Sequence, residues 1–198
     1  MLHPYATDSE ERTKIPFLVA GIAVALAFLI HKSLDAVNWS SPWWIDFSSP
    51  LLLYGAFLYF FDHVGWKWGW LRKIGIVKVP NLSGEWQGSL RSSFDEFSRE
   101  HAAIIHIEQT WTRITIKLQS ASSESLSVVA GLMLNSPDGK ILSYQYRSEP
   151  RANAVDTMQT HLGTTWVAIS KTNGELEGKY YSGRGRQNHG SISLTRKQ

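Results

Sequence analysis

An alternation of apolar and polar residues runs from residue 84 to the C-terminal end, and it constrains the fold more than any other feature. A period of two places every second side chain on one face of a β-strand. Turn sequences such as SPDG, at 136–139, separate the alternating segments. Eight segments follow this pattern: 84–92, 101–109, 111–119, 125–134, 140–147, 163–170, 174–182 and 190–196.

Eight short strands with mostly short connections predict an all-β C-terminal domain. The architecture that fits best is an eight-stranded antiparallel up-and-down β-barrel, lipocalin-like, because closure leaves no exposed edges. A barrel of this size encloses a lumen that can hold one small ligand. A β-sandwich built from the same strands is the alternative.

Two apolar segments precede the strands and predict a membrane α-helical hairpin. The first, 15–30, has sixteen residues without a charge, roughly 24 Å of helix. The second, 50–61, lies between Trp44 and Trp66, which suit two aromatic belts of one bilayer. We therefore expect two transmembrane helices, over about 15–34 and 48–70. A cleaved signal peptide is the alternative for the first segment, and a soluble amphipathic helix for the second.

The predicted organisation has three parts: a polar N-terminal tail at 1–14, the two-helix transmembrane region at 15–77 and the β-barrel at 78–198. Basic residues set the orientation. Two precede the first helix, only Lys32 lies in the connection, and four follow the second helix. This bias places both termini, and with them the barrel, in the cytoplasm.

Composition excludes several classes of function. The chain has no cysteine, so disulfides, thiolate zinc sites and cysteine nucleophiles are excluded. Its net charge of +3 is too small to argue for duplex nucleic acid. The seven histidines show no metal-ligand spacing, and no nucleotide-binding or hydrolase motif is present. The sequence therefore predicts no enzyme, catalytic residue, metal or cofactor, although a Ser/His/Asp set assembled by folding stays open.

Three tyrosines have the strand parity that points into the predicted barrel: Tyr144, Tyr146 and Tyr180. A buried tyrosine needs a hydrogen-bond partner for its hydroxyl group. Several tyrosines in one lumen can stack on a planar ligand and bond to its edges. The alternative is that they are ordinary barrel core.

Two connections contain basic residues. The connection at 147–162 is long, and the connection at 182–190 is rich in glycine. In an up-and-down barrel both lie at the same end. Arginine side chains and the N–H groups of a glycine-rich loop can bind an anion there. The arginines concerned are Arg147, Arg151, Arg184 and Arg186. The alternative is a pair of solvated turns.

The opening of the barrel, NLSGEWQGS at 81–89, and the later IEQTW at 107–111 carry a family resemblance. Together with the order of apolar segments and strands, they resemble the two-transmembrane, β-strand-rich effectors of bacterial cyclic-oligonucleotide-based antiphage signalling (CBASS) systems. Gly84 and Trp86 match the opening of that family's barrel, and we interpret their role as structural.

This resemblance implies an antiphage effector in the bacterial inner membrane. Its barrel would bind a cyclic dinucleotide, which would promote homo-oligomerisation of the transmembrane helices, disrupt the lipid bilayer and kill the infected cell. The tyrosines and arginines suit the bases and phosphates of such a ligand. Two alternatives stay open: a membrane-anchored carrier for a small apolar ligand, and a membrane enzyme.

Overall fold

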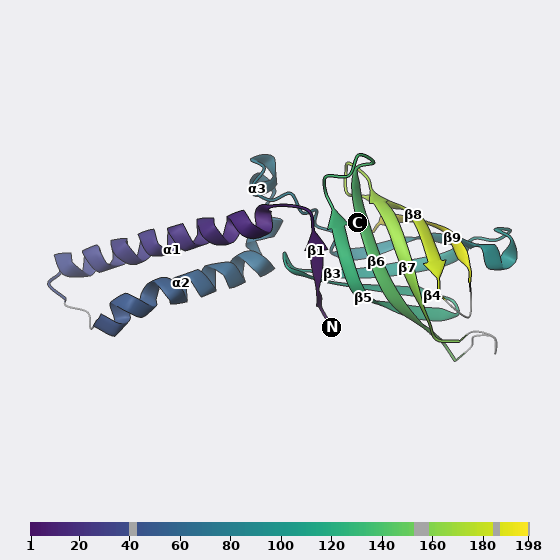
Figure 1. The fold of residues 1–198 in the computed structure, drawn as a ribbon, viewed down its shortest axis with the longest axis horizontal. Coiled ribbons are helices and arrows are strands. Elements are labelled where there is room, and N and C mark those ends of the chain that lie inside the picture. The colour runs from purple at the N-terminus through teal and green to yellow at the C-terminus, as the bar shows by residue number, and fades with distance from the viewer. Residues whose placement is uncertain (40–42, 153–158, 184–186, 198) are drawn as a thin grey trace. The chain divides into compact units, whose positions relative to one another are not determined.

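A computed structural model describes residues 1–39, 43–152, 159–183 and 187–197. For residues 43–48 it describes the backbone only. The chain forms two compact units. Residues 1–9 and 79–198 belong to a β unit, and residues 10–78 belong to a helical unit (Figure 1). The helical unit is therefore inserted in the chain between the first strand and the rest of the barrel.

The β unit is a closed barrel with the strand order β1-β4-β3-β2-β9-β8-β7-β6-β5. Its strands are β1 (His3–Thr7), β2 (Gly84–Ser92), β3 (His101–Gln109), β4 (Arg113–Ser120), β5 (Ser123–Met133), β6 (Lys140–Pro150), β7 (His161–Ile169), β8 (Glu175–Ser182) and β9 (His189–Arg196). Strands β2 to β9 pair with their neighbours in antiparallel fashion. Each of these eight strands matches one of the alternating segments of the sequence.

The predicted count of eight strands was wrong, because the barrel has nine. The additional strand, β1, lies in the segment expected to be a polar tail. It is antiparallel to β4 but parallel to β5, so the barrel is not a simple up-and-down antiparallel one. The five residues of β1 are too few to show an alternation, and long-range pairing rather than local pattern makes them a strand.

The Gly-x-Trp motif of residues 84–86 closes one end of the barrel. Trp86 is fully buried, and its indole N–H donates to the carbonyl of Leu82 at 2.9 Å. The guanidinium of Arg196 lies 5.6 Å from the centre of the Trp86 ring, a cation–π contact. Gly84 has a φ of +126°, which a residue with a side chain rarely adopts. The motif is therefore structural, as we interpreted it.

The second motif, at 107–111, anchors the N-terminal strand at the same end. The buried side chain of Gln109 accepts a hydrogen bond from the Leu82 N–H at 2.8 Å and donates to the carbonyl of Pro80 at 3.2 Å. The hydroxyl of Tyr5 donates to the carbonyl of Trp111 at 2.7 Å. Both quoted motifs thus stabilise the closed end of the barrel.

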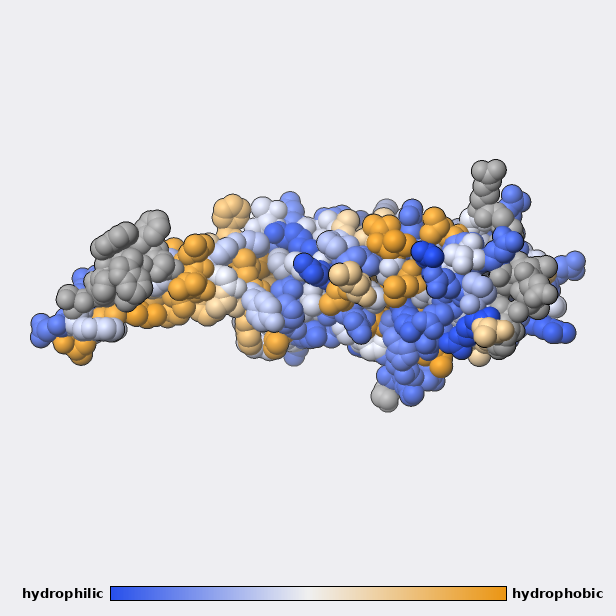
Figure 2. All heavy atoms as spheres, turned by 90° about the horizontal axis from the view of Figure 1, so that it is seen from below, coloured by the Kyte–Doolittle hydropathy of each residue, from blue (hydrophilic) through white to orange (hydrophobic). Residues whose placement is uncertain are grey.

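The helical unit contains α1 (Glu11–Ala36), α2 (Trp43–His63), a 3-10 turn (Gly65–Lys67) and α3 (Gly69–Lys73). Helix α1 contacts α2 along its length (Figure 1). The buried positions of α1 recur every four residues and become smaller along the helix: Ile15, Val19, Ala23 and Ala27. Large apolar side chains of α1 and α2 are exposed, and the surface of both helices is largely apolar (Figure 2).

The predicted pair of transmembrane helices was also wrong. Among the described residues, α1 is the one helix long and apolar enough to cross a membrane by length and composition. Helix α2 includes Asp46, Ser48, Ser49 and Pro50 before its apolar part and ends at Asp62-His63. The spacing of the tryptophans led us to include these polar ends in a membrane span. The apolar stretch itself is shorter than the hydrocarbon core of a bilayer requires.

Candidate functional site

The barrel holds a cavity of about 300 Å³ at the end opposite to Trp86, where β2, β4, β6 and β8 end and β3, β5, β7 and β9 begin. Every strand from β2 to β9 contributes to its wall. Its wall combines aromatic and aliphatic side chains with many hydroxyl groups, and a concave cavity of this size is typical of a small-molecule site.

The three predicted tyrosines, Tyr144, Tyr146 and Tyr180, all line this cavity. The ring centres of Tyr144 and Tyr146 are 6.3 Å apart, with a tilt of 55° between the planes. This is within the range of favourable aromatic pairs. The structure therefore brings together the aromatic half of the predicted site.

Two glycines on neighbouring strands make room for two of these rings. Gly163 lies opposite Tyr146 in the β6–β7 pair, and Gly190 lies opposite Tyr180 in the β8–β9 pair. A Cβ atom at Gly163 would lie 2.3 Å from the Tyr146 ring, and one at Gly190 would lie 2.5 Å from the Tyr180 ring. The rings can therefore lie across the backbone of the adjacent strand only because no side chain is present there.

Tyr144 is the most deeply buried of the three tyrosines. Burial raises the pKa of its phenol well above the ordinary value, although the hydrogen bond to Thr165 opposes the shift. A negative charge on Tyr146 would raise the pKa further. Tyr144 is therefore a neutral hydrogen-bonding group over the whole physiological range of pH.

Hydroxyl groups form most of the polar wall of the cavity, and we did not predict them from the sequence. Seven serines line the cavity: Ser92, Ser120, Ser122, Ser123, Ser125, Ser148 and Ser182. Thr165 and Asn188 add to this set. A hydroxyl group both donates and accepts hydrogen bonds, so this wall suits phosphate oxygens and base edges alike. The sequence feature that could have predicted this wall is the serines at inward-facing positions near the ends of the strands.

Two histidines also face the cavity. The Nε2 atom of His101 lies 2.9 Å from the carboxylate of Asp95. The Nδ1 atom of His161 lies 3.0 Å from the carbonyl of Gln159, and its ring meets that of Tyr146 edge-on. Within the described part of the wall, these are its basic side chains.

Of the predicted arginines, the two that the structure describes, Arg147 and Arg151, do not line the cavity. Arg147 forms an ion pair with Glu149 at 3.1 Å, and both side chains are largely exposed. Arg147 and Arg151 line a separate groove on the outside of the barrel. Arg184 and Arg186 lie outside the described residues.

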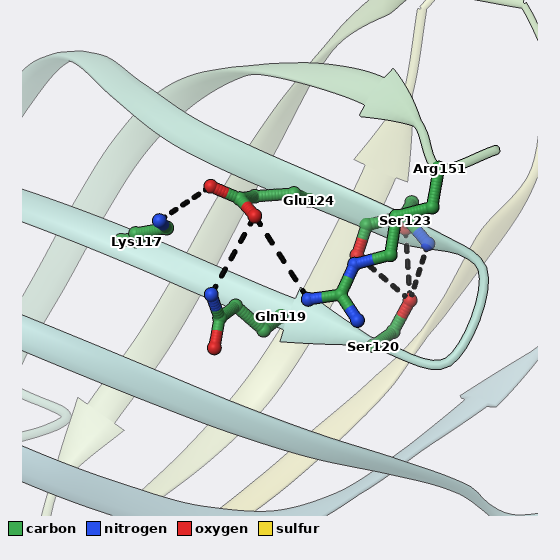
Figure 3. A network of polar contacts seen from close by, with 6 residues as sticks. All are labelled: Lys117, Gln119, Ser120, Ser123, Glu124 and Arg151. Carbon is green, nitrogen blue, oxygen red and sulfur yellow. Dashed lines mark hydrogen bonds and ion pairs between the residues drawn. The ribbon is translucent and has the colours of Figure 1, made fainter.

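Arg151 belongs to a polar network on that outer face (Figure 3). Its guanidinium lies 3.8 Å from the carboxylate of Glu124, which also accepts from Lys117 at 2.5 Å and from Gln119 at 3.5 Å. The hydrogen bond from Lys117 holds the pKa of Glu124 below its ordinary value. The network stabilises the β4–β5 hairpin from outside, so Arg151 has a structural partner.

The described residues offer no group of three or more His, Asp or Glu side chains that could hold a metal ion. The cavity presents ring faces and hydroxyl groups to a ligand.

Comparison with known proteins supports this interpretation. Residues 77–196 match the family model described as Cap15, cyclic dinucleotide receptor domain. The chain is also 29% identical over 197 residues to CD-NTase-associated protein 15 of Yersinia aleksiciae, covering 93% of this chain and 92% of that protein. The match to the family model spans the barrel strands β2 to β9 and the whole wall of the cavity. The chain therefore belongs to the Cap15 cyclic dinucleotide receptor domain family.

Proposed function

We propose that the chain is an antiphage defence effector in which a cyclic dinucleotide, bound in the barrel cavity, controls the helical unit. The observation that carries this proposal is the cavity itself, with three tyrosines and a wall of hydroxyl groups within the region that matches the receptor family. The name of the Yersinia relative, CD-NTase-associated protein 15, supports a signalling role of the same kind.

The chemistry of the wall fits the two parts of such a ligand. Each base presents a planar face, and stacking on an aromatic side chain contributes about 1–3 kcal/mol per base. Each phosphate presents oxygens that accept hydrogen bonds from serine, threonine and asparagine. We assign Tyr146 and Tyr180 to the bases, because glycines hold their rings across the wall. We assign the serine hydroxyls to the phosphates.

We further propose that α1 anchors the protein in the bacterial inner membrane, with the barrel in the cytoplasm. Its apolar length and its exposed large side chains support this part of the proposal. Ligand binding would favour a homo-oligomer, and assembly of the helical units would disrupt the bilayer and kill the infected cell. A ligand shifts such an equilibrium only by binding the assembled state more tightly.

The test is release of a trapped dye from liposomes that contain the full chain. Cyclic di-GMP, cyclic di-AMP and cyclic GMP–AMP are added separately, with the corresponding linear dinucleotides as controls. The proposal expects release with one cyclic species, loss of release in Tyr180→Ala, and normal release in Tyr181→Ala. Tyr181 is the matched control because it follows Tyr180 on β8 but is exposed on the outside. Equal release with and without every cyclic dinucleotide would overturn the proposal.

A further inference from the structure

Strands β4 and β5 are joined at one end of the barrel and separate at the other. Their pairing is limited to Lys117–Gln119 of β4 with Glu124–Leu126 of β5. At the point of separation, the N–H of Ile116 donates to the side-chain oxygen of Ser127 at 2.9 Å. The register of β5 also shifts between Ser127 and Val129. The two strands therefore leave a slot, which begins at Ser127.

Strand β1 lies in this slot and pairs with β4 and β5 at only a few backbone positions. It pairs with β4 at His3 and Pro4, and with β5 from Tyr5 to Thr7. Side chains add to this hold: the Nε2 atom of His3 lies 2.7 Å from the Ser127 hydroxyl, and Tyr5 is buried at the closed end. The slot thus recognises the sequence HPYAT through both backbone and side chains.

The way that β1 is connected sets it apart from the other strands. Each of β3 to β9 follows the preceding strand through a turn or loop of the same unit, whereas residues 10–78 separate β1 from β2. Strand β1 can therefore leave the slot without the displacement of another strand. Its departure exposes one edge of β4 and one edge of β5, and exposed edges bind other strands readily.

We propose that the slot between β4 and β5 is a strand-acceptor site whose second occupant is β1 of another copy of this chain. A second copy presents the same sequence, so every contact made within one chain can be made between two chains. Such exchange of an identical element is a low-cost route to oligomers. The short connection at 8–10, between β1 and α1, favours exchange because short hinges restrict closure within one chain.

Exchange of β1 links two barrels through a segment that continues directly into α1. The slot then determines which helical units are held together, independently of any ligand. The assembly step of the proposed function does not require this slot. Strand exchange is argued from the geometry of the slot alone, and its test does not use dye release.

Cysteine crosslinking tests the exchange, because the natural chain has no cysteine. Ala6 and Gly131 are register partners in the β1–β5 pair. A Cβ atom at Gly131 would have only the Ala6 carbonyl oxygen nearby, at 4.0 Å, so a cysteine fits there. Full-length Ala6→Cys and Gly131→Cys chains with different tags are co-purified in detergent without ligand and oxidised.

The expected result is a disulfide between the two differently tagged chains, seen as a shift from one-chain to two-chain mobility that reductant reverses. The matched control uses Gln87→Cys and Thr195→Cys, exposed register partners on β2 and β9 that could exchange only by unfolding. Crosslinking no greater than in this control would overturn the proposal, provided that the double variant Ala6→Cys/Gly131→Cys closes its disulfide within one chain.

The double variant separates this inference from the proposed function. Its internal disulfide holds β1 in its own barrel. If the oxidised variant still releases dye with a cyclic dinucleotide, and the tagged chains do not crosslink, the effector function stands and strand exchange is wrong. If the tagged chains crosslink but no cyclic dinucleotide causes dye release, exchange stands and the proposed function is wrong.

Discussion

Tyr146 and Gly163 form a pair in which the absence of a side chain on one strand sets the position of a ring on the next. We expect Gly163→Ala to destabilise the barrel by about 1–3 kcal/mol, because the added methyl group overpacks the site. Gly131→Ala is the control, since its methyl group would meet only the Ala6 carbonyl oxygen, at 4.0 Å, an ordinary van der Waals contact. The free energy of unfolding in urea measures both, and equal values would contradict this account of the ring's position.

Tyr144 makes the stability of the barrel sensitive to alkaline pH. Burial raises its folded-state pKa above the ordinary value of 10.0 that applies to the unfolded chain. The unfolded chain therefore loses this proton first, and stability falls as pH rises above the ordinary value. We expect Tyr144→Phe to lose about 1 kcal/mol at neutral pH, through its hydrogen bond to Thr165.

Above the ordinary value, the Tyr144→Phe variant should lose less further stability than the wild type. Thermal unfolding midpoints over a pH series measure this difference. Parallel curves for the two proteins would contradict the assignment of Tyr144 as a buried neutral phenol.

The positions of the arginines show what strand parity alone could have predicted. Tyr146 points into the barrel, so Arg147, its neighbour on β6, must point outward. We predicted Arg147 beside the tyrosines because Arg147 and Tyr146 both lie next to the 147–162 connection. The same parity placed Tyr144, Tyr146 and Tyr180 in one cavity correctly, and it would also have found Ser148.

At the scale of elements, Asp8 fastens β1 to the barrel. Its carboxylate accepts hydrogen bonds from the N–H groups of Leu134 and Asn135, at 2.7 and 2.9 Å. Burial opposes ionisation, but these two bonds, together with hydrogen bonds from the backbone of Asp8 and the side chain of Asn135, lower the pKa of Asp8. The stabilisation is therefore present above the ordinary value of 3.8 and is lost as pH falls through the folded-state pKa.

We expect Asp8→Asn to unfold at a lower temperature than the wild type at neutral pH, with the difference disappearing in acid. Asp138→Asn, in the turn between β5 and β6, is the control for loss of a carboxylate elsewhere. Unfolding midpoints over a pH series measure both variants. A difference that persists in acid would show that Asp8 acts through something other than its charge.

Helix α1 carries the proposed membrane contact through its exposed face. Ile22, which is 50% exposed, lies near the middle of the apolar stretch. An arginine at the centre of a membrane helix costs about 2.5–3.5 kcal/mol on insertion scales. We expect Ile22→Arg to move protein from the membrane to the soluble fraction, and Thr13→Arg, before the stretch, to leave it in place. Unchanged fractionation of Ile22→Arg would contradict insertion of α1.

Elements differed in how well their sequences predicted them. Strands β2 to β9 alternate over eight to eleven residues and end at turns, so local pattern was sufficient to find them. Strand β1 has five residues and is determined by its partners β4 and β5, which no local pattern reveals. Helix α2 was found, but its flanking tryptophans suggested a membrane span that its polar residues contradict.

At the scale of the whole molecule, the chain places a ligand cavity and an apolar helical unit on one polypeptide with two covalent connections between them. One connection follows β1, and the other precedes β2. Both leave the closed end of the barrel near the buried set formed by Tyr5, Gln109 and Leu82. The cavity lies at the opposite end of the barrel.

The most direct test of the central claim is a calorimetric titration of the full chain with the same three cyclic dinucleotides. The account predicts saturable binding of one of them at micromolar affinity or better, about −8 kcal/mol. Tyr180→Ala should weaken binding about tenfold or more, because it removes a stacking surface, whereas Tyr181→Ala should bind as the wild type does. Binding that is equally strong in Tyr180→Ala, or no binding of any cyclic dinucleotide by the folded chain, would contradict the assignment of the cavity.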